Sequence, residues 1–344
     1  MVARYQKHIL EFKRPSGTSR GVLKTKETWF IIIENQGNYG VGECGILRTL
    51  SVDDVPEYEK TLKWTCDNIH LGLSELLNKL LAFPSIQFGL EQAFLSLQQS
   101  NPFELFPSKF TQGTDAIPIN GLVWMGDEQF MKTQIKEKIE QGFSCIKMKI
   151  GAIDFETELR LLKSIRKEYS KNDIELRVDA NGAFSIDDAL EKLNILSELN
   201  LHSIEQPIKP RQPHEMAELC AKTPLAIALD EELIGVFSVT NKEKIIQIIQ
   251  PQYIILKPSL VGGFKGSEEW MSIAEKNNVK YWITSALESN VGLNAISQWT
   301  YTLNSKLPQG LGTGSLYTNN IDSPLEVKNG ALLYNENLNW NFNY

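Results

Sequence analysis

The chain has 344 residues, of which 42% are hydrophobic and 22% are charged, proportions typical of a globular enzyme. Its formal net charge of −7 argues against nucleic acid or an anionic membrane surface as the main partner. The longest obvious apolar run, residues 29–33, is far too short to cross a bilayer. A chain of this length can bury a large core and has room for a barrel plus a smaller domain.

The cysteines and the N-terminus indicate the compartment. The four cysteines are widely spaced and form no Cys-x-x-Cys pair, so we predict buried, reduced thiols rather than disulfides or a zinc site. The N-terminal residues carry scattered charges and lack the apolar block of a signal peptide. We therefore expect a cytoplasmic protein.

Residues 1–112 do not alternate regularly between strands and helices. A strand near residues 5–12 is followed by a polar turn, PSGTSRG, and then by two β-rich runs, WFIIIEN and YGVGE. The residues between these two runs, 35–38, are typical of a hairpin. Three helical patterns follow, at 53–69, 73–81 and 85–100. This combination predicts an α+β module.

From residue 113 onward, strands alternate with amphipathic helices. The clear β-rich runs are IPINGLV, CIKMKI, IELRVDA, LHSIEQP, LAIALDE, YIILKPS and YWITSALES. Such alternation predicts βαβ units and a parallel sheet, and residues 309–311 could supply a short eighth strand. We predict a (β/α)₈ barrel over residues 113–318, with residues 319–344 packing back on the N-terminal module.

Five charged residues each close one of these apolar runs: Lys149, Asp179, Glu205, Asp230 and Lys257. The steps of 30, 26, 25 and 27 residues match the length of one strand-plus-helix unit. In a barrel the C-terminal ends of all strands gather on one face, where active sites are built. The alternative fold, a doubly wound open sheet, would not gather five consecutive strand ends at its crevice. We therefore expect the five side chains to meet.

Three of these residues, Asp179, Glu205 and Asp230, are acids. Carboxylate oxygens suit a hard cation, so we predict Mg²⁺, with Mn²⁺ as a substitute. Zinc is disfavoured because no His or Cys lies at these strand ends. The plain alternative, that each acid caps the following helix, explains one such acid more easily than three in succession.

The lysines predict proton chemistry. Lys147 and Lys149 share one face of a strand, because alternate residues point the same way. A lysine base must be neutral, so its pKa must fall below the ordinary value of about 10.4. The ammonium of Lys147 and a nearby cation would both favour neutral Lys149. We predict Lys149 as the general base, Lys147 as its electrostatic neighbour, and Lys257 as a second base or a fixed charge across the metal. The reaction class is removal of a proton α to the carboxylate of a small-molecule substrate.

These motifs, taken in order, resemble those of the enolase superfamily, in its muconate-lactonizing-enzyme-like branch. The matching segments are KMK at 147–149, VDANG at 178–182, EQP at 205–207, LDE at 229–231 and LKPS at 256–259. Each motif is weak alone, but the ordered set is specific and covers most of the chain. The resemblance implies that residues 1–112 form a capping domain over the barrel.

Two further segments, SALESNVG at 285–292 and GLGTGSLYTNN at 310–320, look like those of the o-succinylbenzoate synthases. That resemblance implies a hydro-lyase of menaquinone biosynthesis that converts 2-succinyl-6-hydroxy-2,4-cyclohexadiene-1-carboxylate into 2-succinylbenzoate. Lys149 would take the α-proton and return it to the departing hydroxyl, while Lys257 stays charged. The alternative is a dipeptide epimerase or N-acylamino-acid racemase of the same superfamily. Dipeptide epimerases usually carry Asp-x-Asp near the last strand, where this chain has residues 312–314, GTG.

The same resemblance implies supporting roles for further residues. Asn181 and Glu231 are expected beside the metal ligands, and Arg177 is expected to hold one of them. The backbone N–H groups of the glycine-rich segments 261–266 and 310–314 could receive a substrate carboxylate. The residues expected to contact the substrate are Ser19, Arg20, Ser285, Ser289, Gly312 and Thr313.

Overall fold

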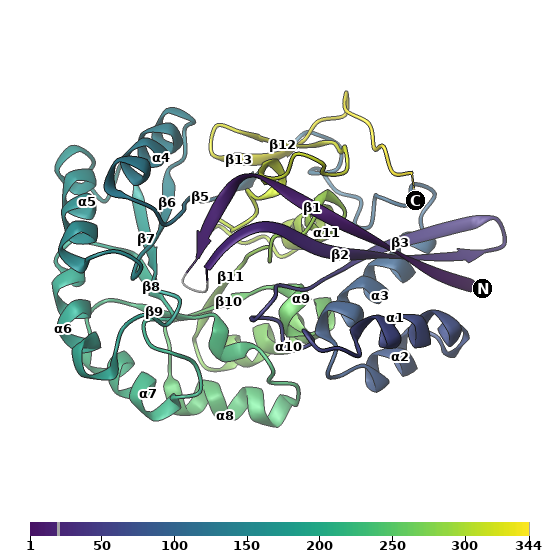
Figure 1. The fold of residues 1–344 in the computed structure, drawn as a ribbon, viewed down its shortest axis with the longest axis horizontal. Coiled ribbons are helices and arrows are strands. Elements are labelled where there is room, and N and C mark those ends of the chain that lie inside the picture. Colours follow the sequence, from purple (N-terminus) through teal and green to yellow (C-terminus); the bar gives the residue numbers. More distant parts are fainter. Residues whose placement is uncertain (19–20, 344) are drawn as a thin grey trace.

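The structure, a computed structural model, describes residues 1–18 and 21–343. Its N-terminal part is an antiparallel sheet in the order β1-β2-β3, formed by β1 (Val2–Thr18), β2 (Gly21–Asn35) and β3 (Asn38–Gly45). β1 is longer than the predicted strand and continues into the segment expected to be a polar turn. In Figure 1 the long β1–β2 ribbon extends from the N-terminal helices towards the barrel strands.

The side-chain alternation of β2 explains how this sheet joins the rest of the molecule. Trp29 and Ile31 pack in the cluster formed with the N-terminal helices. Phe30 and Ile32 point to the other face, where they pack with Val291 of the barrel. Because successive strand residues face opposite sides, one apolar run is buried on both faces.

The N-terminal helices are α1 (Tyr58–Asp67), α2 (Leu73–Lys79) and α3 (Pro84–Leu97), with a 3₁₀ turn at Ile69–Leu71. α3 packs directly on β3. A Cβ atom added to Gly42 would lie 1.9 Å from the carbonyl oxygen of Gly89, so this close backbone contact requires glycine. The predicted α+β composition of this part is confirmed.

The second part is a parallel sheet of seven strands in the sequential order β5 to β11. Its strands are β5 (Gly121–Val123), β6 (Cys145–Lys149), β7 (Glu175–Asp179), β8 (Ser203–Glu205), β9 (Ile227–Leu229), β10 (Tyr253–Leu256) and β11 (Lys280–Ile283). A doubly wound sheet reverses its strand order at a switch point, whereas this order never reverses. The predicted barrel is therefore confirmed and the open-sheet alternative is wrong.

Helices between the strands cover the outside of the sheet (Figure 1). They are α4 (Glu128–Glu140), α5 (Phe155–Glu168), α6 (Ile186–Ser197), α7 (Pro213–Lys222), α8 (Val239–Ile249), α9 (Pro258–Val261), α10 (Gly263–Lys276) and α11 (Asn290–Thr302). Several begin at a side-chain cap. Asp154, for example, accepts a hydrogen bond from the Thr157 N–H, and Ser185 accepts one from the Asp188 N–H.

Two residues close the barrel between β11 and the first strand. The Gln309 N–H donates to the Pro118 carbonyl at 2.9 Å, and the Gly310 N–H donates to the Ile283 carbonyl at 2.8 Å. These contacts form parallel bridges on both sides, Ile119 to Gln309 and Thr284 to Gly310. The eighth strand expected at residues 309–311 is thus present as a minimal bridge.

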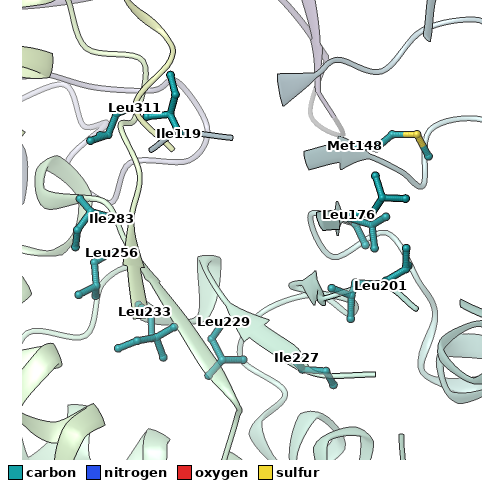
Figure 2. Close-up of a cluster of buried hydrophobic side chains, with 14 of the residues drawn as sticks. Ile119, Met148, Leu176, Leu201, Ile227, Leu229, Leu233, Leu256, Ile283 and Leu311 are labelled. Carbon is teal, nitrogen blue, oxygen red and sulfur yellow. The ribbon is translucent and has the colours of Figure 1, made fainter. Parts of the chain in front are cut away.

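Apolar side chains from successive barrel strands form one large buried cluster, part of which Figure 2 shows. In β6, Ile146 and Met148 belong to this cluster, while Lys147 and Lys149 alternate with them and contact the acids of the neighbouring strands. The period of two therefore separates the packing residues of each strand from its polar residues.

The C-terminal segment makes several different contacts. β12 (Leu325–Lys328) and β13 (Ala331–Tyr334) form a hairpin that pairs with β4 (Ile117–Pro118), just before the first barrel strand. Beyond the hairpin, Trp340 stacks on Phe103 with ring centroids 4.1 Å apart, and Phe342 contacts Phe30. Asn319, at the start of this segment, also bonds to β1, accepting from the Glu11 N–H and donating to the Ile9 carbonyl, each at 2.8 Å.

All four cysteines are free and buried, so the prediction of buried, unpaired thiols is confirmed. Within residues 1–18 and 21–343, no helix has both the length and the apolar character needed to span a bilayer.

Candidate active site

The three predicted metal ligands lie at the same end of the barrel. Asp179 closes β7, Glu205 closes β8, and these two residues are direct partners in the strand register. Asp230 follows β9 immediately. All three side chains are buried, with exposed fractions of 1%, 2% and 3% for Asp179, Glu205 and Asp230. Burial of three adjacent acids is costly unless cations compensate their charge.

Three lysines supply that compensation. Lys147 Nζ donates to Asp179 Oδ2 at 3.0 Å and to Glu205 Oε2 at 2.6 Å. Lys149 Nζ donates to the same Asp179 oxygen at 3.0 Å and to Asn181 Oδ1 at 2.7 Å. The two lysines expected to share one face of β6 therefore do so.

Lys257 approaches from the other side of the acid cluster. It follows β10, its Nζ forms an ion pair with Asp230, and it lies 3.9 Å from Glu205 Oε1. Lys149 contacts Asp179, whereas Lys257 contacts Asp230. The two amines thus flank the row of acids from different strands, as the spacing of the sequence predicted.

The pKa values of Asp179 and Glu205 are shifted in opposite directions. Burial raises the pKa of Asp179, but the charges of Lys147 and Lys149 outweigh burial and hold this pKa below its usual range. The pKa of Glu205 is raised by burial and further by the negative charge of Asp179. Burial lowers the pKa of the Lys147 ammonium, but the attraction of Asp179 and Glu205 outweighs burial, so the net shift of this pKa is upward.

The carboxylate oxygens of Asp179, Glu205 and Asp230 are the type of ligand that a divalent cation such as Mg²⁺ binds. Among the residues that the structure describes, no group of three His, Cys, Asp or Glu side chains is already arranged as a metal site, and the acids are bonded to lysines instead. However, Glu205 Oε1 is buried without a hydrogen-bond partner. Three adjacent carboxylates, one of them with an unsatisfied oxygen, are ligands that Mg²⁺ favours.

Asn181 and Glu231 lie beside this cluster. The Asn181 N–H donates to Asp179 Oδ1 at 3.0 Å, and its side-chain amide donates to Glu231 Oε1 at 3.0 Å. Asn181 has a φ of 45°, in the left-handed region that Asn tolerates better than most residues. Asn181 therefore connects Lys149, Asp179 and Glu231.

The expectation that Arg177 holds a metal ligand is not met. Its guanidinium donates to Glu175 Oε1 at 2.7 Å and to the Pro308 carbonyl at 3.0 Å, and it lies 4.3 Å from the centre of the Trp282 ring. The alternation of β7 does place Arg177 on the same face as Asp179. Its long side chain turns towards the other end of the strand, where it packs in the barrel interior.

The substrate-contact residues have different outcomes. Ser285 and Thr313 line the cavity at the barrel mouth and bond to each other through their hydroxyl groups at 2.6 Å. Gly312 also lines this cavity. Ser19 and Arg20 fall outside the described residues.

Ser289 was expected to contact the substrate, but its side chain does not face the cavity. It is fully buried and caps α11, and its hydroxyl donates to Glu43 Oε2 at 2.5 Å. Its N–H also donates to Glu43 Oε1, at 2.8 Å. Ser289 therefore belongs to the contact between the N-terminal sheet and the barrel.

The glycine-rich segment 261–266 binds a carboxylate of the protein itself. Glu91 on α3 accepts hydrogen bonds from the N–H groups of Phe264 at 2.5 Å and Lys265 at 3.0 Å. The expectation that these N–H groups receive a substrate carboxylate is therefore wrong, because Glu91 already occupies the start of α10.

The cavity above the acids has a volume of about 570 Å³. Lys147, Lys149, Asp179, Asn181 and Lys257 form its polar floor. This volume is in the usual range for a small-molecule site.

The N-terminal sheet supplies part of the cavity wall. Lys13 of β1 and Leu23 of β2 line it, together with residues 47–50 after β3. The family resemblance had pointed to Ser19 and Arg20 of the PSGTSRG segment but not to Leu47 or Arg48, because no local motif marks residues that reach a cavity across a domain contact.

The closed barrel and its buried acids and lysines define a (β/α)₈-barrel enzyme. At the mouth of the barrel, the acids are suited to bind a divalent cation and the lysines are suited to transfer protons. The family model described as "Enolase C-terminal domain-like" matches residues 131–337. The chain is 45% identical to an o-succinylbenzoate synthase from Desulfotalea psychrophila, over 95% of this chain and 97% of the relative.

Solved structures agree with this likeness. The crystal structure of MenC from Desulfotalea psychrophila has a TM-score of 0.86 and 41% identity, covering 97% of this chain and 99% of that one. A dipeptide epimerase from Enterococcus faecalis, crystallised with Mg and the dipeptide L-Leu-L-Tyr, has a TM-score of 0.84 over 97% of each chain. Its identity of 18% makes this a likeness of fold alone. The chain belongs to the o-succinylbenzoate synthase family of the enolase superfamily.

Proposed function

We propose that the chain catalyses the dehydration of 2-succinyl-6-hydroxy-2,4-cyclohexadiene-1-carboxylate to 2-succinylbenzoate, a hydro-lyase step of menaquinone biosynthesis. The observation that carries this proposal is the 45% identity to an o-succinylbenzoate synthase across nearly the whole of both chains. The lysines on the two sides of the acid cluster supply the groups that such a reaction needs. The substrate is therefore a small carboxylate.

Asp179, Glu205 and Asp230 would hold Mg²⁺, and Mn²⁺ would substitute because it also accepts oxygen ligands. The support is the donor set itself, together with the unsatisfied buried oxygen of Glu205. When bound, the cation supplies Lewis-acid stabilisation of the charge that develops on the substrate carboxylate.

Lys149 performs the proton transfers. In its neutral form it takes the proton α to the carboxylate, and the electron pair of the broken C–H bond moves towards the carboxylate. The ammonium of Lys149 then protonates the hydroxyl on the same face of the ring, and the C–O bond breaks to release water as the electron pair held in the enolate returns to form the new ring double bond. The ring becomes aromatic, and Lys149 returns to its neutral form. One group can do both steps because the elimination is syn.

Lys257 contributes positive charge from the other side of the acids. Its position beside Asp230 places an ammonium opposite Lys149, where it stabilises the enolate without transferring a proton. Asn181 orients Lys149 through the 2.7 Å hydrogen bond between its Oδ1 and Nζ. The cavity walls from β1, β2 and residues 47–50 reduce the access of water to the reacting groups.

The location that we propose is the cytoplasm. The support is that all four cysteines are free and buried, as in proteins of reducing compartments.

A paired assay tests the activity. Purified protein with Mg²⁺ should dehydrate the cyclohexadiene carboxylate, which is followed by the appearance of the aromatic product. The same preparation should epimerise L-Ala-L-Glu far more slowly, because the segment 312–314 has no acid to bind a substrate ammonium. Faster epimerisation than dehydration would contradict the proposal and favour the epimerase alternative.

A further inference from the structure

Gln206 follows the metal-ligand candidate Glu205 directly and has no part in the mechanism described above. Its side chain is fully buried, and its φ of 39° lies in the left-handed region, which is uncommon for a residue other than glycine. Its main chain is bonded on both sides: its N–H donates to the Ala228 carbonyl at 2.9 Å, and its carbonyl accepts from the Gly182 N–H at 2.7 Å. The residue is thus held by the segment after β7 on one side and by β9 on the other.

The side-chain amide of Gln206 reaches across to the turn that contains Asp230. Its Oε1 accepts hydrogen bonds from the Asp230 N–H at 3.2 Å and from the Glu232 N–H at 3.3 Å. Its Nε2 donates to the Ile208 carbonyl at 3.0 Å and to Glu232 Oε2 at 3.5 Å. Each polar atom of this amide therefore has partners, and two of the bonds fix the backbone at Asp230 and Glu232.

These two hydrogen bonds hold the backbone at the start of the turn after β9, where Asp230 lies. They come from the residue next to Glu205, so one side chain links the segments that carry two of the candidate metal ligands.

Gln206 is not among the described residues that line the cavity, so it acts on the reaction only through other groups. We propose that Gln206 is a positioning residue that couples Glu205 to Asp230, so that the two carboxylates converge on one divalent cation. This inference rests on the metal site of the proposed function. It adds a residue whose loss weakens cation binding without removing any ligand.

Gln309 offers a matched control. It is also a buried barrel glutamine, with an exposed fraction of 1%. Its Oε1 accepts from the Ile283 N–H at 2.7 Å, and its Nε2 donates to the Leu307 carbonyl at 2.5 Å and to Ser305 Oγ at 3.1 Å. Gln309 thus makes a comparable set of hydrogen bonds at the barrel closure, without bonding to an acid of the site.

The experiment compares Gln206→Met with Gln309→Met, since methionine keeps the approximate volume and removes the amide. Both variants should show a similar fall in melting temperature without Mg²⁺. Calorimetric titration with MgCl₂ should show a dissociation constant about 10–100 times higher than wild type for Gln206→Met only, the range observed for groups that orient metal ligands. Activity should return towards the wild-type value when Mg²⁺ is raised to saturate the variant.

Two results would overturn the inference: an Mg²⁺ affinity of Gln206→Met within twofold of wild type, or an equal loss in both variants. Should Gln206→Met not fold, Gln206→Asn and Gln309→Asn replace the pair, because the shorter side chain withdraws the amide from Asp230. The same two criteria then apply. A wild-type chain that binds no Mg²⁺ would be a different failure, since it would overturn the proposed metal site and this inference with it.

Discussion

Lys149 and Asp179 are direct partners in the register of β6 and β7, so the position of the candidate base is set by the barrel itself. Its amine bonds to one of the three acids, Asp179, and its second hydrogen bond goes to Asn181 Oδ1. Lys147, two residues earlier, lies deeper and is bonded to two acids. The depth of each lysine in the barrel therefore decides its role: Lys147 pairs with the acids, and Lys149 is the candidate base.

Replacement of Lys149 should abolish dehydration and preserve the fold. We expect Lys149→Ala to lose at least about a thousandfold in kcat, in the range for general acid–base groups. Lys149→Arg should be equally inactive, because its guanidinium keeps the charge but does not act as a base at neutral pH. Circular dichroism and kcat measure the two properties, and Lys136→Ala on the exposed face of α4 is the control. Substantial turnover by Lys149→Ala would show that another group is the base.

Lys257 should tolerate a change that keeps its charge. Lys257→Arg is expected to reduce dehydration by less than Lys257→Met, because the enolate needs a positive charge and not a proton from this side. The measurement is kcat for both variants at saturating Mg²⁺. Equal and complete loss in both would mean that Lys257 transfers a proton.

At the start of two barrel helices, backbone N–H groups donate hydrogen bonds to glutamates of the N-terminal part. Glu43 on β3 accepts hydrogen bonds from the Ser289 N–H and from the Gly292 N–H, each at 2.8 Å, at the start of α11. Glu91 on α3 does the same for α10. A carboxylate is favourable at a helix N-terminus, where free N–H groups and the helix dipole meet. These contacts fix the sheet on the barrel and hold β1 and β2 over the cavity.

Glu91 should make stability depend on pH. Burial raises its pKa to about 7, although the N–H groups of Lys265 and Phe264 oppose the rise. Because the folded state then binds more protons than the unfolded state, stability falls as the pH rises from about 4.5 to about 7. Glu91→Gln lacks this titration, so relative to wild type it should gain roughly 2–3 kcal/mol of stability between pH 5 and pH 8.

Urea unfolding at both pH values measures that difference. Glu75→Gln on the exposed surface of α2 is the matched control, and it should follow the wild type at both values. A constant difference between Glu91→Gln and wild type across this pH range would show that the Glu91 carboxyl titrates normally.

The active cavity lies between the two parts of the molecule, with its floor in the barrel and part of its wall in the N-terminal sheet. The acid cluster is neutralised mainly by lysines of the same barrel. The charges of the floor are therefore balanced within the barrel, and the sheet mainly shapes and closes the cavity.

Removal of the cation should stop catalysis and leave the chain folded. With EDTA we expect activity to disappear and the far-ultraviolet circular dichroism to stay unchanged, because Lys147 and Lys257 still pair with the acids. Addition of Mg²⁺ or Mn²⁺ should restore activity and raise the melting temperature, since a ligand of the folded state stabilises it. Full activity in metal-free protein would contradict the metal-dependent mechanism.

Much of this architecture was predictable because its causes are periodic. The strand–helix rhythm indicated a barrel, and the regular recurrence of charged strand ends indicated that they would meet. The alternation within β6 placed Lys147 and Lys149 on one face. In each case the signal lies within one strand or one βα unit, so a single sequence contains it.

Contacts between distant segments could be settled only by the folded chain. Ser289 bonds to Glu43, 246 residues away, and Phe264 bonds to Glu91, 173 residues away. Arg177 shares a strand face with Asp179, yet its long side chain packs against Trp282. The period of two in a strand indicates to which face of the sheet a side chain points. The residue that this side chain then contacts depends on how distant segments pack, and the spacing of residues along the chain does not encode that packing.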